Sequence, residues 1–115
     1  MEADPNGLDK HTPGAKLDLG KSPVVRGLFD YFPRACLEVA RVSDFGQRKY
    51  SWKGWESVPD GVNRYWDALG RHILYESIEG PIDRESGLLH AAQQAWNALA
   101  RLELILKEKD AVHKP

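Results

Sequence analysis

Carboxylate and imidazole side chains gather in one stretch of this 115-residue chain, between residues 72 and 90. His72, Glu76 and Glu79 recur at spacings of four and three residues, so they form a ridge on a helix that turns by about 100° per residue. Asp83 and Glu85 follow in the acidic segment GPIDRESG, and His90 lies near the start of the next helix. Two antiparallel helices joined by this short connector would bring all six together, and oxygen-rich sites with one or two imidazoles suit Mg²⁺ or Mn²⁺. The predicted metal ligands are His72, Glu76, Glu79, Asp83, Glu85 and His90.

The same acids also have ordinary structural interpretations. Glu76 falls within the apolar stripe of its helix, which consists of Tyr65, Trp66, Leu69 and Ile73. Burying a carboxylate without a partner costs several kcal/mol, so either a core hydrogen-bond or salt-bridge partner or a cation must compensate it. Asp83 and Glu85 could equally be capping residues near the N-terminus of the following helix.

The next helix carries a narrow polar row beside an apolar band. Offsets of 4, 7 and 11 residues return to one face, and they align His90, Gln94, Asn97 and Arg101. The band beside this row consists of Leu88, Ala91, Ala95, Ala98, Leu102 and Ile105. Because the row lacks the Glu and Lys of a solvated face, it is either a set of directed hydrogen-bonding and ligand groups or a polar seam that faces a symmetry mate.

The segment RKYSWKGW interleaves basic and aromatic side chains. Tyr50 and Trp52 could stack on a nucleobase while the neighbouring Lys49 holds a phosphate. Alternatively, the aromatic side chains of this segment close the core.

Helices must position these groups. Apolar spacing predicts a first helix from Pro33 to Gly46, followed by an ordered loop over 47–61. A second helix is expected from the N-cap Asn63 to about Glu79, where Gly80 and Pro81 end it, and a third from the N-cap Ser86 to about Lys107. No stretch has the pattern of a strand, so the predicted class is all-α, a small bundle of three to four helices.

Composition sets the domain plan and excludes several function classes. Polar, Pro- and Gly-containing residues over 1–21 predict a flexible N-terminal arm, residues 22–108 one all-α domain, and residues 109–115 a tail. So small a core favours a homo-oligomer. With 16 basic and 17 acidic side chains, the chain is not expected to bind a nucleic-acid polymer. One cysteine, no leader pattern and no long apolar run indicate a cytoplasmic protein without a membrane partner.

These motifs together resemble a known family. The strings FGQRKYSWKGW, RYWDALGRH and GPIDRESGLLHAAQQAWNALARLEL resemble the N-terminal domain of phage and prophage dATP/dGTP diphosphohydrolases over most of residues 16–106. The resemblance implies an all-α, MazG-like pyrophosphohydrolase that uses a divalent metal. In this comparison Glu76 and Glu79 look like the first acidic pair of MazG-like enzymes, and His90 with Gln93 takes the place of the second. Gln93 stands where the family pattern has a second histidine, and an amide is a poorer metal ligand than imidazole.

The resemblance implies hydrolysis of purine deoxynucleoside triphosphates to monophosphate and pyrophosphate in the bacterial host cytoplasm. Glu76 and Glu79 would be catalytic carboxylates, and Lys49 and Arg71 would neutralise the leaving pyrophosphate. The expected substrate-binding side chains are Tyr50, Trp52, Gln94 and Asn97. Two alternatives stay open: a non-catalytic protein that sequesters a nucleotide or binds a host protein through the same pocket, and a structural oligomer whose polar row is only a seam.

Overall fold

The computed structural model describes residues 2–113, and the chain divides after Pro33 into two compact units. The prediction of an all-α class is confirmed, because every regular element in the described residues is helical. The remaining regular pairing there is one isolated antiparallel bridge between Ile82 and Leu89.

The N-terminal unit is organised around the buried side chain of Asp4. Its Oδ1 accepts a hydrogen bond from the backbone N–H of Asn6 at 2.7 Å, and its Oδ2 accepts one from Lys16 at 2.8 Å. The backbone N–H of Leu19 closes the loop on the carbonyl of Ala3 at 2.8 Å. These bonds fall within the predicted arm, so residues 2–19 carry defined turns. The flexibility of the arm stays a prediction.

Helix α1 runs from Pro33 to Lys49, three residues beyond the predicted end. Gly46 does not end it, since a single glycine costs a helix interior only about 1 kcal/mol relative to alanine. An ion pair between Arg48 and Asp44, 3.2 Å long and one turn apart, supports the last turn. The predicted loop that follows contains a short 3₁₀ turn, η2, over Gly54–Ser57.

Helix α2 runs from Gly61 to Glu79, so its predicted C-terminus is confirmed and its predicted N-cap is wrong. The capping position belongs to Asp60, and the Asn63 side chain donates a hydrogen bond back to Asp60 Oδ1 at 2.9 Å. The first residue of this helix is a buried glycine against which Leu104 packs. A Cβ on Gly61 would lie 2.6 Å from Leu104 Cδ1.

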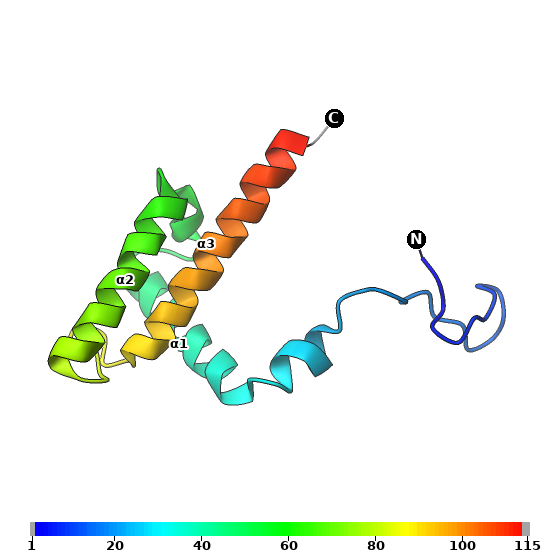
Figure 1. The fold of residues 1–115 in the computed structure, drawn as a ribbon, viewed down its shortest axis with the longest axis horizontal. Helices are drawn as coiled ribbons and strands as arrows, with labels where there is room; N and C mark the ends of the chain where they lie inside the picture. The colour runs from blue at the N-terminus through cyan, green and yellow to red at the C-terminus, as the bar shows by residue number, and fades with distance from the viewer. Residues whose placement is uncertain (1, 114–115) are drawn as a thin grey trace. The chain divides into compact units, whose positions relative to one another are not determined.

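Helix α3 runs from His90 to His113 and packs antiparallel beside α2 (Figure 1). Ser86 is therefore not its N-cap. The Ser86 hydroxyl accepts the backbone N–H of Leu88 at 3.1 Å, which makes a local turn before the helix starts. The helix passes the predicted end at Lys107 because the following KEKDAV segment contains mostly good helix formers.

The predicted apolar faces of α2 and α3 are only partly covered within one chain. The buried hydrophobic residues among the described residues are Ala92 and Ala100, which are 7% and 4% exposed. About half of the surface of each large apolar residue on these faces is exposed: 53% for Trp66, 49% for Ile73 and 51% for Leu102. Most of the α3 band that was expected to pack inward is likewise exposed. None of the helices described here is long and apolar enough to cross a membrane.

Candidate functional site

Three of the six predicted metal ligands converge where α2, the connector and α3 meet. One ligand atom from each of His72, Asp83 and His90 lies within 4.8 Å of the other two. The two imidazoles approach through their Nδ1 atoms at 3.0 Å, and the ring of His90 is completely buried. Two imidazoles and a carboxylate form a donor set that could hold a divalent cation.

Hydrogen bonds from both sides hold the Asp83 carboxylate. The backbone N–H of Glu85 donates to Oδ1 at 2.9 Å, and the Gln93 amide donates to Oδ2 at 2.9 Å. Gln93 is buried, and it also donates to the hydroxyl of Ser86 at 3.2 Å. The amide that replaces the expected histidine therefore orients the carboxylate of Asp83.

Glu79 lies on the far side of the His90 ring. Its Oε1 is 2.6 Å from His90 Nε2, so this nitrogen donates a hydrogen bond to the carboxylate. With the proton held on Nε2, the neutral imidazole keeps its lone pair on Nδ1, which faces His72. Glu79 thus fixes the orientation and tautomer of His90 from outside the three-residue cluster.

Local electrostatics favour a neutral imidazole beside an ionised carboxylate. Desolvation lowers the pKa of His72, and the nearby His90 and Arg71 lower it further against the opposing effect of Asp83. Burial raises the pKa of Asp83, but the hydrogen bonds from Glu85 and Gln93, together with the nearby His90 and His72, hold that pKa below its usual value. A neutral imidazole and a carboxylate are the forms that bind metal ions.

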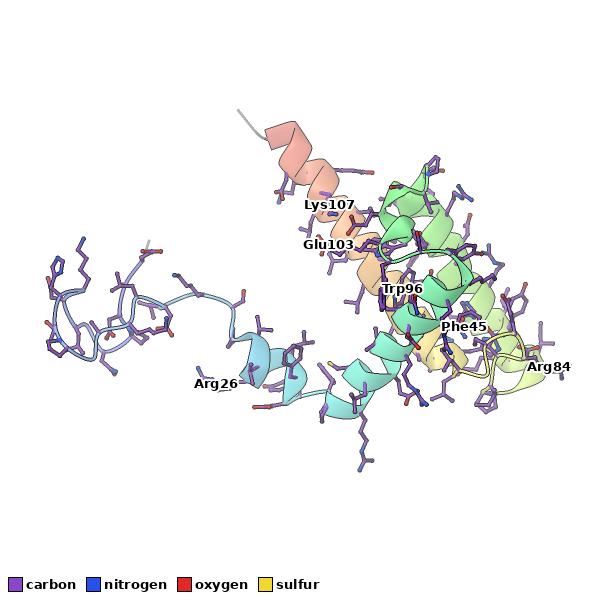
Figure 2. The ribbon with its side chains drawn as sticks, turned by 180° about the vertical axis from the view of Figure 1, so that it is seen from behind. Arg26, Phe45, Arg84, Trp96, Glu103 and Lys107 are labelled. Atoms are coloured by element: carbon purple, nitrogen blue, oxygen red, sulfur yellow. The ribbon has the colours of Figure 1, made fainter. Side chains whose placement is uncertain are left out.

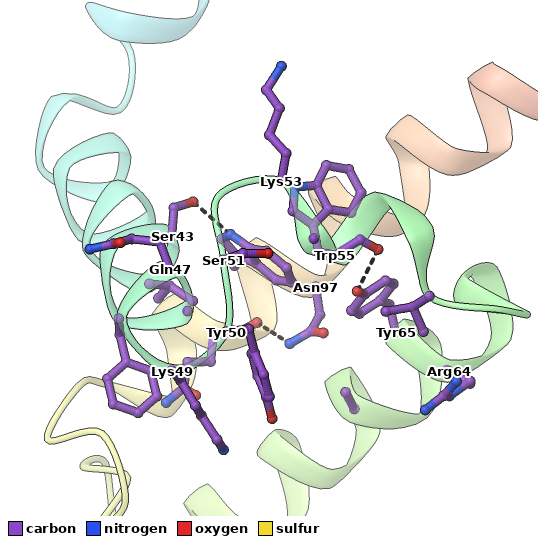
Figure 3. A pocket seen from close by; sticks show the side chains of 18 of the residues that line it. Ser43, Gln47, Lys49, Tyr50, Ser51, Lys53, Trp55, Arg64, Tyr65 and Asn97 are labelled. Atoms are coloured by element: carbon purple, nitrogen blue, oxygen red, sulfur yellow. Dashed lines mark hydrogen bonds between the residues drawn. The ribbon is translucent and has the colours of Figure 1, made fainter.

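This cluster opens into a cavity of about 890 Å³ between the C-terminal end of α1, the loop after it, and helices α2 and α3 (Figure 3). His72 and Asp83 line the cavity, whereas His90 lies behind them. The volume falls within the range of small-molecule sites, about 300–1,000 Å³.

Cationic side chains line the same cavity. Lys49 forms an ion pair with Glu85 at the mouth, and this hydrogen bond raises the pKa of Lys49. Arg71 is exposed and makes no ion pair with the described residues. Two positive side chains near three potential metal ligands suit an anionic ligand such as a phosphate ester.

The aromatic side chains of the RKYSWKGW segment serve two roles. Tyr50 and Trp52 line the cavity and are 76% and 66% exposed. Lys49 Nζ lies over the Tyr50 ring, 5.3 Å from its centroid. Trp55 instead packs edge-to-face on Tyr65 and Trp96, with centroids 6.1 and 5.9 Å apart, and its carbonyl accepts the Tyr65 hydroxyl at 2.8 Å. The core-closing alternative therefore applies to Trp55, and stacking of Tyr50 and Trp52 on a base stays a prediction.

The other predicted site residues divide between the cavity and its surroundings. Asn97 is buried in the cavity wall, where its amide donates to the Gln93 carbonyl at 2.7 Å. Glu76 and Gln94 do not line the cavity, and the Gln94 amide donates to Glu76 Oε1 at 3.3 Å. A hydrogen-bonding partner therefore compensates the carboxylate of Glu76.

Trp96 is a wall residue that the sequence analysis did not select. Figure 2 labels Trp96 on α3. Its Nε1 donates to the hydroxyl of Ser43 at 2.9 Å, which ties α3 to α1, and both residues line the cavity. Its position on α3, about 240° around from His90 at 100° per residue, lies outside both the polar row and the apolar band. An amphipathic side chain at such a position was the available signal.

Comparisons with known proteins identify the family of this chain. The family model for the N-terminal domain of dATP/dGTP diphosphohydrolase matches residues 11–114. A dATP/dGTP diphosphohydrolase of Salmonella phage PMBT28 is 40% identical over 82 residues, which are 71% of this chain and 26% of that protein. The chain thus spans about a quarter of the relative's length, and no solved structure gives a significant match. By the extent of the family match, the chain belongs to the dATP/dGTP diphosphohydrolase N-terminal domain family.

Proposed function

We propose that this domain is a metal-dependent hydrolase that converts dATP or dGTP into the monophosphate and pyrophosphate. The observation that carries the proposal is that potential metal ligands and unneutralised positive charge line one cavity large enough for a nucleotide. The name of the phage relative supports the same activity and substrate class.

The donor set fits a divalent cation. Two nitrogen ligands about 2.1 Å from a metal and at right angles to one another lie about 3.0 Å apart, which matches the separation of the His72 and His90 Nδ1 atoms. With Asp83 as the third ligand, the set contains two imidazoles. Mg²⁺ prefers oxygen ligands alone, so Mn²⁺ is the better fit of the two ions. When bound, the cation supplies Lewis-acid polarisation of a phosphoryl oxygen.

The side chains of the cavity bind and orient the triphosphate. Lys49 exchanges its ion pair with Glu85 for a phosphate oxygen, and Arg71 reaches a second phosphate from α2. Tyr50 or Trp52 stacks on the purine at the open side of the cavity. Because the Asn97 amide nitrogen is engaged by Gln93, its carbonyl oxygen is the group available to accept a hydrogen bond from the base.

Hydrolysis joins a water oxygen to the α-phosphorus and breaks the bond from that phosphorus to the bridging oxygen. The water's proton ends on the pyrophosphate or in bulk solvent. Lys49 and Arg71 neutralise the negative charge that accumulates on the departing pyrophosphate. Glu79 acts as a positioning residue through His90, whereas Glu76, which does not line the cavity, has no part in these steps.

The test is release of pyrophosphate from dGTP and dATP in the presence of Mn²⁺ or Mg²⁺. We expect multiple turnovers from the unmodified protein and no detectable turnover from Asp83→Asn, which keeps the size of the side chain but loses a charged ligand. Asp110→Asn, an exposed substitution on α3, is the matched control and should retain activity. Unchanged turnover by Asp83→Asn would refute the assignment.

One structural feature favours a rival function. The buried Gln93 amide is engaged by Asp83 and Ser86, so it does not add a fourth strong metal ligand. A site with three protein ligands could hold a nucleotide without turning it over, as a sequestering protein would. Recovery of intact triphosphate, bound with equal stoichiometry and released on denaturation, would favour this rival over the hydrolase.

A further inference from the structure

The amide of Asn97 carries one hydrogen-bonding atom that the described residues leave free. Asn97 is 6% exposed and lines the cavity, and Figure 3 shows its side chain pointing into the cavity from α3. Its Nδ2 donates to the Gln93 carbonyl at 2.7 Å, whereas no described residue donates to its Oδ1. Among the described side chains that are not exposed, the unpartnered polar atom sealed from solvent is Arg101 Nε. Asn97 Oδ1 is therefore open to the cavity.

The hydrogen bond to Gln93 fixes the orientation of this amide. In a flipped amide, Oδ1 would face the Gln93 carbonyl across 2.7 Å, and two acceptors repel one another at that distance. The side chain of the same Gln93 donates to Asp83 Oδ2 at 2.9 Å. One residue thus positions both a candidate metal ligand and the free acceptor.

Asn97 lies at a suitable distance from the three-residue cluster to contact a base. It follows His90 by seven residues on α3, which is about 10 Å along the helix axis. A nucleoside has a similar length between its 5′-phosphate and the far edge of its base. With the phosphates near His72 and Asp83, the sugar fills this interval and the base edge reaches Asn97.

Two neighbouring polar groups of the cavity wall are already paired within the protein. The indole N–H of Trp96 donates to the Ser43 hydroxyl at 2.9 Å, and the Tyr65 hydroxyl donates to the Trp55 carbonyl at 2.8 Å. All four residues line the cavity. A buried acceptor beside such groups stays unsatisfied unless a ligand or a water molecule donates to it.

We propose that Asn97 Oδ1 accepts a hydrogen bond from the exocyclic amino group of the purine and so selects bases that carry one. This inference rests on the proposed function, because it assigns the base specificity of the same cavity. Adenine carries its amino group at N6 and guanine at N2, so either base can donate to a single acceptor. A purine without the amino group displaces water from Oδ1 without replacing its hydrogen bond, and therefore binds more weakly.

Nucleotide pairs that differ only in the amino group test the proposal. The first pair is dATP and the triphosphate of unsubstituted purine deoxyriboside, and the second is dGTP and dITP. Each is used as its non-hydrolysable α,β-methylene analogue, and calorimetry in the presence of Mn²⁺ measures Kd. For the unmodified protein, the amino group should strengthen binding about 10-fold in at least one pair, which identifies the position that is read. Equal Kd values within both pairs would overturn the proposal.

The variant Asn97→Ala tests whether Asn97 is the residue that reads the amino group. Its preference for the amino group should fall to less than about twofold, and a preference that persists would assign the recognition to another residue. Because each comparison is a ratio within one variant, a general loss of affinity cancels. Asn97→Leu, which fills the volume without an acceptor, repeats the test should Asn97→Ala unfold. Asn63→Ala, the same change at an exposed position outside the cavity, is the matched control and should keep the full preference.

Failure of this inference can be distinguished from failure of the proposed function. Analogues that bind without an amino preference, together with turnover of the natural triphosphates, would exclude only the role of Asn97. An amino preference without turnover would support the role of Asn97 in a sequestering protein and exclude the hydrolase. Analogues that do not bind at all would refute both.

Discussion

The contact between Glu79 and His90 supports both the stability of the fold and the metal affinity of the site. Glu79→Ala removes the acceptor 2.6 Å from His90 Nε2, on a ring that is completely buried. A buried donor left without an acceptor costs about 1–3 kcal/mol. In a domain of this size each kcal/mol lowers Tm by about 4–8 °C.

The same variant should weaken metal binding. Loss of a partner that orients a ligating histidine typically reduces metal affinity about 10- to 100-fold. This factor corresponds to about 1.4–2.7 kcal/mol of binding free energy. The ion pair of Glu79 with Arg84 adds little to either effect, because it is 3.8 Å long and the Arg84 side chain is 81% exposed.

Urea unfolding with and without Mn²⁺ measures both effects on one sample. Glu79→Gln should lose less than half as much stability as Glu79→Ala, since the carbonyl oxygen of glutamine can still accept from His90. Glu103→Ala is the control, because Glu103 is exposed on α3 and forms no ion pair with the described residues. If Glu79→Ala unfolds at the same urea concentration as the unmodified protein, the hydrogen bond does not contribute to stability. If stability falls but Mn²⁺ affinity is unchanged, the positioning role is wrong.

Three further outcomes follow from single contacts. Gly61→Ala should destabilise the protein by about 1–3 kcal/mol in urea unfolding, because its Cβ would lie 2.6 Å from Leu104 Cδ1; equal stability would contradict the packing described. Lys49→Ala should raise KM for dGTP about 10-fold through loss of a phosphate contact, with a smaller change in kcat; an unchanged KM would remove Lys49 from the substrate site. The backbone hydrogen bond from Lys16 lowers the pKa of Asp4 below that of an unfolded chain, so its stabilising contribution is complete above about pH 4 and is lost as pH falls through the lower folded pKa. The Lys16 amide resonance in NMR should therefore shift below pH 4 and not above it, and a midpoint above pH 4 would contradict the assignment.

The helical class was predictable from the sequence, but most helix ends were not. Apolar spacing located the α-helices α1, α2 and α3, because period 3.6 extends over many residues and averages out local exceptions, and it missed the five-residue π-helix η1 over Val25–Phe29. Their ends depend on single contacts that spacing does not encode. The hydroxyl of Ser86 is used in a turn before α3, and Gly46 is tolerated inside α1. At Gly61, the first residue of α2, Leu104 from more than forty residues away occupies the place of a side chain, and no local pattern reports such packing.

The site was predictable as a neighbourhood, and its internal order was not. Ridge spacing and the short connector brought His72, Asp83 and His90 to one place, as the sequence analysis expected. The roles of Glu79 and Gln93 depend on which side of His90 and Asp83 each one approaches. A projection at 100° per residue gives directions around a helix axis to within a few tens of degrees, which is too coarse to tell a ligand from the residue that orients it.

The polar row of α3 illustrates this limit most clearly. Its four members span only about 60° around the helix, so the sequence treated them as one functional group. In the structure the four residues make different contacts. Asn97 lines the cavity and His90 contacts His72 behind the cavity wall, whereas Gln94 contacts Glu76 and Arg101 stacks on Trp66. Both interpretations of the row, ligand groups and a seam against a symmetry mate, stay predictions, and the structure shows that the row does not act as one group. Changes at 72 and 83 should act on metal binding.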